Sequence, residues 1–143
     1  MTLQKIVRHL ERSIPLHYAA SYDNVGLQIG NPDTTITGVL FTLDVTALTI
    51  KEAQKKGCNL IVTHHPLIFK PLYHIGQDHV GEALSLAIKN DIAIYAAHTN
   101  FDHLADGINQ HLASQLMLTA YEPLSPLAGE KNCLLYTSDA ADE

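Results

Sequence analysis

Apolar and polar residues follow two different periods along the first third of the chain. In residues 2–13 apolar side chains recur every three or four positions, which predicts an amphipathic α-helix with Thr2 at its capping position. Residues 34–45 are instead rich in β-branched and apolar side chains, which predicts a strand. This strand ends at Asp44, a residue type that favours capping of a following helix.

Two further helix and strand pairs follow in the pattern. We expect a helix over 46–56 that stops at Gly57, a strand over 59–64, a loop over 66–77, a helix over 78–90, a strand over 91–98 and a last helix over 105–117. Strands that alternate with helices at this spacing predict an α/β fold, with a mainly parallel sheet and flanking helices.

Composition narrows the class of protein without naming a function. The chain has 143 residues, of which 46% are hydrophobic and 17% charged, as in an ordinary globular domain. No apolar run approaches the roughly 20 residues of a membrane-spanning helix, and we expect no membrane partner. The two cysteines, Cys58 and Cys133, suit a reducing compartment, so we expect a cytoplasmic location. The net charge of -6 and the scattered Lys and Arg residues argue against binding to nucleic acid.

The last eleven residues need separate treatment. Residues 133–143, CLLYTSDAADE, resemble one reading frame of the transposon-end adaptor used to prepare sequencing libraries. They follow the preceding GEKN without any turn or helix signal. The alternative interpretation is that they form a native acidic tail. We therefore predict a domain over 1–132 and a non-native tail over 133–143. On this reading the native protein continues beyond Asn132 and the present chain is a fragment.

Histidines and carboxylates follow the predicted strands. The three strands end at Asp44, at His64 and His65, and at His98, with Asp102 four residues further on. Because the carboxyl ends of parallel strands meet at one edge of a sheet, these side chains should gather there. Six of the nine histidines also fall within 40 residues of one another, which raises the question of a metal.

Imidazole nitrogen and carboxylate oxygen together suit zinc, iron or manganese. Neighbouring side chains on a strand point to opposite faces, so His64 and His65 would reach two adjacent ions only if the backbone turns there, as Pro66 favours. Asp102 would then bridge two ions about 3.5 to 4 Å apart. The alternative is that the two histidines are capping or surface residues. Cys58 opens a buried strand, where packing is its expected role.

Four segments together resemble a known family. YDNVGLQIG, GVLFTLDVT, NLIVTHHPLIF and AIYAAHTNFDHLADGIN, in this order, are similar to the NGG-interacting-factor (NIF-three) family, whose bacterial members often carry the name GTP cyclohydrolase 1 type 2 homolog. The resemblance covers nearly all of residues 1–132. It implies the N-terminal half of a NIF-three-like α/β fold that assembles into dimers and toroidal hexamers. Residues 121–132 resemble the approach to a small ferredoxin-like domain that longer members insert.

The resemblance also implies a set of site residues. Two divalent metal ions would be held by His64, His65 and a bridging Asp102, and a further histidine and glutamate would come from beyond this chain. Four other residues match positions near the metals, either behind the ligands or on the substrate side: Tyr22, Asp23, Asn24 and His98.

The implied activity is that of a dinuclear metal-dependent hydrolase when full length, with an unknown small-molecule substrate and no guanine-specific feature in the sequence. The fragment alone would then be inactive. The alternative from another class is a non-catalytic, metal-binding oligomeric scaffold or regulator, because both functions need the same ligands.

Overall fold

The fold is built on one four-stranded sheet. The computed structural model describes residues 1–119, 125–126 and 133–134. The strands lie in the order β1-β4-β3-β2, with bounds Gly26–Ile29 (β1), Val39–Thr42 (β2), Leu60–Thr63 (β3) and Ala93–Ala96 (β4). Strands β2, β3 and β4 are parallel, whereas β1 pairs with β4 in the antiparallel sense. The predicted α/β fold with a mainly parallel sheet is therefore confirmed.

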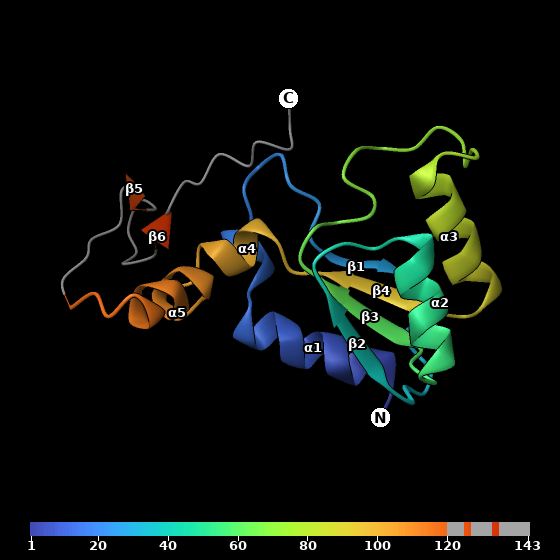
Figure 1. Ribbon diagram of the computed structural model, residues 1–143, viewed down its shortest axis with the longest axis horizontal. Coiled ribbons are helices and arrows are strands. Elements are labelled where there is room, and N and C mark those ends of the chain that lie inside the picture. Colours follow the sequence, from blue (N-terminus) through green and yellow to red (C-terminus); the bar gives the residue numbers. More distant parts are fainter. Residues whose placement is uncertain (120–124, 127–132, 135–143) are drawn as a thin grey trace.

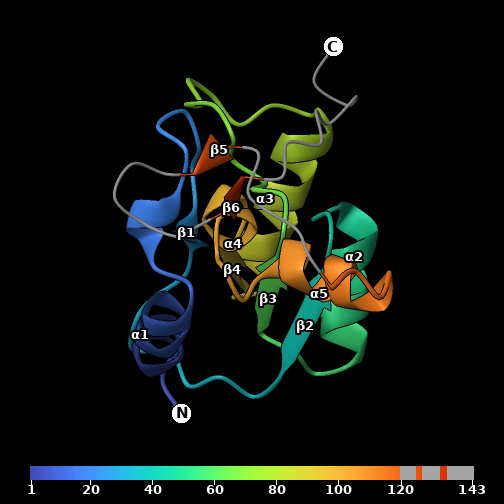
Figure 2. The ribbon, with the colours of Figure 1, turned by 90° about the vertical axis from the view of Figure 1, so that its left-hand side faces the viewer.

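Helices cover both faces of the sheet. Helix α1 (Leu3–Ser13) lies on one face, and α2 (Ala47–Lys55) and α3 (His79–Lys89) lie on the other (Figure 1). The view in Figure 2 looks along these layers, with the sheet between α1 and α2. The remaining elements are η1 (Leu16–Tyr18), α4 (Thr99–Asp102), α5 (Ile108–Gln115), and the paired short strands β5 (Ser125–Pro126) and β6 (Cys133–Leu134).

Strands β3 and β4 are buried on both faces, because consecutive residues of a strand point to opposite sides. Ile61 and Ile94 join the core under α2 and α3, whereas Leu60 and Tyr95 join the core under α1. All of these side chains are almost fully buried. The two central strands are thus held firmly, and the residues that follow them start from fixed positions.

Two elements differ most clearly from the predicted bounds at their ends. The strand predicted over 34–45 is confined to β2, because the backbone before it bonds elsewhere: Ile36 N–H donates to the Met1 carbonyl, and Thr37 N–H donates to the Asn59 side chain at 2.8 Å. The helix predicted over 105–117 begins only at Ile108, after a turn at residues 104–107.

Asp44 does not cap the helix that follows it, so that expectation was wrong. Thr46 is the capping residue: its hydroxyl accepts a hydrogen bond from Thr49 N–H, and the Thr49 hydroxyl in turn accepts one from Thr46 N–H. Thr2 does stand at the start of α1, but its side chain makes no capping hydrogen bond.

The predicted tail falls mostly outside the described residues. Residues 133–134 pair with 125–126, and the rest of 133–143 lies outside the described residues. Most of the segment 121–132, which resembles the approach to an inserted domain, also lies outside them. The division into 1–132 and 133–143 therefore stays a prediction. In the part of the chain that the structure describes, no helix is both long enough and apolar enough to cross a membrane.

Candidate metal centre

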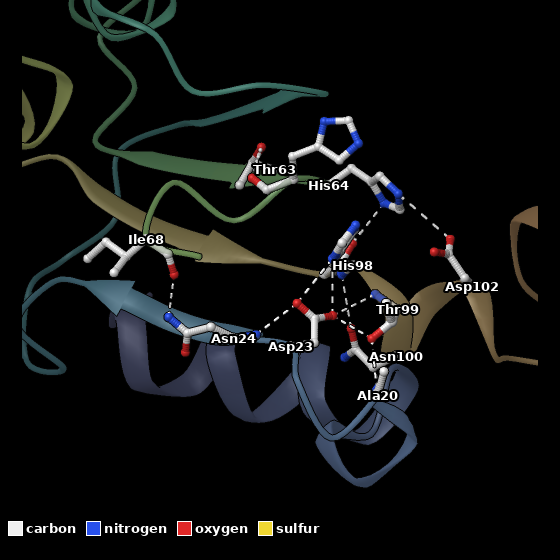
Figure 3. A network of polar contacts seen from close by, with 12 residues as sticks. Ala20, Asp23, Asn24, Thr63, His64, Ile68, His98, Thr99, Asn100 and Asp102 are labelled. Carbon is white, nitrogen blue, oxygen red and sulfur yellow. Dashed lines mark hydrogen bonds and ion pairs between the residues drawn. The ribbon is translucent and has the colours of Figure 1, made fainter. Parts of the chain in front are cut away.

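The polar residues that end the parallel strands meet at one edge of the sheet. Strand β3 runs directly into His64 and His65, β4 is followed by His98, and β2 is followed by Asp44. Figure 3 shows His64 and His98 projecting beyond the strand ends toward each other. The rings of His64 and His98 have their centroids 5.1 Å apart.

The backbone turns at the end of β3, which brings two adjacent histidines to the same place. The Thr63 hydroxyl donates to the carbonyl oxygens of Leu43, at 2.9 Å, and of His65, at 3.1 Å. His65 N–H also donates to the Leu43 carbonyl. The imidazoles therefore do not diverge as they would on a straight strand, and the ring centroids of His64 and His65 lie 5.1 Å apart.

Three imidazoles form a compact cluster. One ring nitrogen from each of His64, His65 and His98 can be chosen so that all three lie within 4.8 Å of one another. Nitrogens bound to one tetrahedral zinc ion lie about 3.3 to 3.4 Å apart, since zinc–nitrogen bonds are about 2.0 to 2.1 Å long. The three imidazoles would therefore have to move closer together to bind a single ion. Sequence reasoning placed His98 behind the ligands or beside the substrate, whereas the structure places its ring directly against the other two.

Asp102 reaches the cluster through one turn of helix. His98 precedes α4, and Asp102 N–H donates to the His98 carbonyl at 3.1 Å, so the two residues lie one above the other on the same side. The Asp102 carboxylate then approaches His64, with 3.7 Å between Oδ1 and Nε2 (Figure 3). The structure thus brings together His64, His65 and Asp102, the three residues that the sequence singled out as ligands.

Each imidazole of the cluster is oriented through its Nδ1 atom. His64 Nδ1 lies 3.0 Å from the Ala97 carbonyl oxygen, and His65 Nδ1 lies 2.7 Å from Asp44 Oδ1. His98 Nδ1 lies 3.1 Å from both carboxylate oxygens of Asp23. A neutral imidazole that donates from Nδ1 carries its lone pair on Nε2, and metal-binding histidines are commonly held in this way. The donor set therefore fits a divalent metal ion.

Asp23 is the most deeply held carboxylate of the site. Its side chain is 0% exposed, and besides His98 it accepts hydrogen bonds from the backbone N–H of Thr99, at 3.0 Å, and from the Thr99 hydroxyl. Burial on its own raises the pKa of this carboxyl, but the hydrogen bonds from His98 and Thr99 outweigh burial and lower the pKa to about 2. Asp23 is therefore charged at neutral pH and fixes the orientation of His98.

Burial also changes the acid–base behaviour of His64 and Asp102. It lowers the pKa of His64, helped by the neighbouring His98 and His65 and opposed by the Asp102 carboxylate. Burial raises the pKa of Asp102, against the attraction of His64. A lowered histidine pKa favours the neutral imidazole, which is the form that binds a metal.

Tyr22 and Asn24 lie at the rim of the site. Asn24 Nδ2 donates to the Ile68 carbonyl oxygen at 2.5 Å and so holds the loop that leaves His65. The Tyr22 ring is 62% exposed and lies 6.5 Å, between centroids, from Phe69. Phe69 itself lies 6.4 Å from His98.

Sequence reasoning missed Phe69 and the contact of Asp44 with His65. Neither could be found from local spacing, because Phe69 sits in a loop without periodicity and Asp44 follows β2, whereas His65 follows β3. Two nearby histidines, His74 in the loop and His79 at the start of α3, are exposed and do not join the cluster.

The edge of the parallel sheet gathers three imidazoles and a carboxylate, which are donors of the kind that bind metal ions. Comparisons with known proteins identify the family. The model of the Duf34/NIF3 (NGG1p interacting factor 3) family matches residues 1–140, so this chain belongs to that family. A Bacillus subtilis protein named GTP cyclohydrolase 1 type 2 homolog is 44% identical over 124 residues, which is 86% of this chain and 33% of that protein. A Clostridium perfringens protein of the same name is 41% identical over 117 residues, 81% of this chain and 45% of that protein.

A solved structure agrees with these relatives. The crystal structure of a Bacillus cereus protein related to NIF3 superposes with a TM-score of 0.83 at 44% identity, covering 89% of this chain and 36% of that one. The resemblance to the NIF-three family seen in the sequence is therefore confirmed. The chain spans about a third of the length of the Bacillus subtilis relative that it matches.

Proposed function

We propose that this chain supplies part of a dinuclear metal centre of a hydrolase, in which His64, His65 and Asp102 hold two divalent ions. The observation that carries the proposal is the cluster itself: three ring nitrogens within 4.8 Å of one another, with the Asp102 carboxylate 3.7 Å from His64. Zinc, iron and manganese are the ions that such nitrogen and oxygen donors favour. The name that the relatives carry is consistent with a hydrolytic activity but does not identify this chain's substrate.

Different residues of the chain would orient the ligands of such a centre and bridge its ions. Asp44 and Asp23 hold His65 and His98 in one orientation, and the Ala97 carbonyl does the same for His64. Asp102 has a second carboxylate oxygen besides the one near His64, which suits a bridging position between two ions. A bound pair of divalent ions supplies Lewis acidity, which polarises a phosphoryl or carbonyl oxygen and lowers the pKa of a water molecule.

The test is metal-dependent hydrolysis measured with a matched histidine control. The chain, and a form extended to the length of its relatives, are each loaded with zinc, manganese or iron and assayed against a panel of phosphate esters and cyclic amides. Each form carries His64→Ala in one variant and His111→Ala in another, because His111 is an exposed histidine of α5. We expect the extended form to hydrolyse at least one substrate, and His64→Ala but not His111→Ala to abolish that activity.

Three other results would change the proposal in different ways. Metal binding that depends on His64, without turnover of any substrate by the extended form, would support the alternative of a non-catalytic metal-binding scaffold. Activity that survives His64→Ala would contradict the proposed site itself. Full activity in the present chain would show that the site is complete without further ligands.

Self-association forms part of the same proposal, as dimers or, for the full-length protein, hexamers. Strand β2 is an edge of the sheet, and Phe41 on it is 73% exposed. Leu43, which follows β2, and Leu48, at the start of α2, are also largely exposed. Exposed apolar groups beside an unpaired strand edge are typical of an interface. Light scattering of the purified protein would measure the assembly directly. A cytoplasmic location stays a prediction from the cysteine content.

A further inference from the structure

Two aromatic rings stand beside the imidazole cluster. The centroids of Tyr22 and Phe69 lie 6.5 Å apart with their planes at 68°, and those of Phe69 and His98 lie 6.4 Å apart at 83°. Both separations fall within the range of about 4.5 to 7 Å that is typical of interacting aromatic rings. Rings that stand nearly at right angles form a corner, in which a third planar ring can stack on one wall and direct its edge at the other. We refer to Tyr22 and Phe69 as the aromatic corner.

The corner is held in place although both of its residues lie outside helices and strands. Phe69 follows Ile68, whose backbone is bound on both sides by one side chain: Gln28 Oε1 accepts from Ile68 N–H at 3.0 Å, and Gln28 Nε2 donates to the Ile68 carbonyl at 3.3 Å. Asn24 donates to the same carbonyl. Tyr22 precedes Asp23, which is anchored by Thr99 and His98. Anchoring of this kind reduces the entropy lost when a ligand binds.

The exposure of the corner indicates a role other than core packing. Tyr22 is 62% exposed and Phe69 is half-buried, and neither ring belongs to the two hydrophobic core clusters of the described residues. Small-molecule sites typically combine a few convergent polar groups with aromatic walls. Here the polar groups are the imidazoles and Asp102, and the walls are Tyr22 and Phe69.

We infer that the aromatic corner binds a planar heteroaromatic ring of the substrate and thereby places an attached phosphate or carbonyl group at the metal centre. This inference rests on the proposed function and adds to it the substrate class and two residues that determine specificity. Stacking on aromatic side chains recognises the flat face common to all such rings, so the corner selects for the presence of a ring rather than for one particular base.

The test compares two ligands that differ only by the ring. Guanosine 5′-monophosphate and ribose 5-phosphate are titrated by calorimetry into the zinc-loaded chain, and into the metal-free chain. The variants Tyr22→Leu and Phe69→Leu each remove one ring and keep an apolar side chain. The matched control is Tyr73→Leu, because Tyr73 lies in the same loop as Phe69 and its ring is 98% exposed. Zinc content is measured for every variant.

We expect the nucleotide to bind at least about tenfold more tightly than the sugar phosphate in the wild type and in the control, since a stacked base adds roughly that much or more to affinity. This ratio should fall below about threefold in Tyr22→Leu and Phe69→Leu, with zinc content and sugar phosphate affinity unchanged.

Other outcomes separate the two proposals. Zinc-dependent binding of both ligands with no advantage for the ring, or an equal advantage in all variants, would overturn the aromatic corner and leave the metal centre standing. A ring advantage that persists without zinc, with no binding of the sugar phosphate, would support the corner and contradict the metal centre. Binding of neither ligand would overturn both.

Discussion

The buried Asp23 carboxylate should stabilise the folded chain strongly, and its contribution follows from its pKa. That pKa is lowered from 3.8 to about 2, which corresponds to about 2.4 kcal/mol at about 1.4 kcal/mol per pKa unit. The side chain is 0% exposed but the residue as a whole is only partly buried, so about 2.4 kcal/mol is the upper limit of this contribution. Asp23→Asn keeps the size of the side chain but cannot carry the charge that His98 and Thr99 bind.

The pH dependence has a definite sign. Because the folded pKa lies below the unfolded value, the stabilisation is complete well above pH 4 and is lost as the pH falls toward 2. Linkage with these two values leaves about 1.3 kcal/mol at pH 3. We therefore expect Asp23→Asn to lower the free energy of unfolding by about 2 kcal/mol at pH 7, and by about 1 kcal/mol less than that at pH 3.

The assay is urea unfolding of the metal-free protein, with a chelator present, followed by circular dichroism because the chain has no tryptophan. Asp33→Asn is the control, since Asp33 is an exposed carboxylate, and it should change stability by less than about 0.5 kcal/mol. Equal destabilisation by Asp23→Asn at pH 7 and pH 3 would refute the reasoning, as would no destabilisation at pH 7.

Three further predictions test the packing and the tail. Tyr95→Phe should leave the free energy of unfolding unchanged or raise it by about 1 kcal/mol, because the Tyr95 hydroxyl is buried without a hydrogen-bond partner among the described residues; a loss above 1 kcal/mol in urea unfolding would contradict this. Gly81→Ala should lower the free energy of unfolding by about 1 to 3 kcal/mol despite the better helix propensity of alanine, since a Cβ atom there would lie 2.2 Å from the Gly76 carbonyl oxygen. Higher stability of this variant in the same assay would show that the loop at Gly76 moves to make room for the Cβ atom. Removal of residues 133–143 should leave the thermal midpoint unchanged, and a fall of several degrees would mean that these residues belong to the native fold.

The convergence of the site could be predicted from the sequence because the buried strands specify it. Strands β3 and β4 read as continuous apolar segments, and parallel pairing places whatever follows them at one edge. His64, His65 and His98 therefore had to lie close together. The helical turn of α4 was not predicted, although it is what returns Asp102 to His64.

The parts that could not be predicted depend on contacts between distant segments. Asp44 follows a strand and precedes a helix, so capping was the natural local interpretation, but His65 from the neighbouring strand binds its carboxylate instead. Likewise, nothing in residues 22–30 indicated antiparallel pairing, because β1 is short and its partner β4 lies far along the chain. Such pairings are properties of the assembled sheet and not of the segments.

The most direct measurement is anomalous diffraction from zinc-grown crystals of the form extended to the length of its relatives, because the proposed centre takes further ligands from beyond this chain. The account predicts anomalous peaks at the strand-end cluster, about 2.0 to 2.2 Å from nitrogens of His64 and His65 and from an oxygen of Asp102, with two peaks about 3.5 to 4 Å apart bridged by Asp102. A single peak would contradict the dinuclear part of the account. No peak at these residues, with zinc bound elsewhere or nowhere, would contradict its central claim.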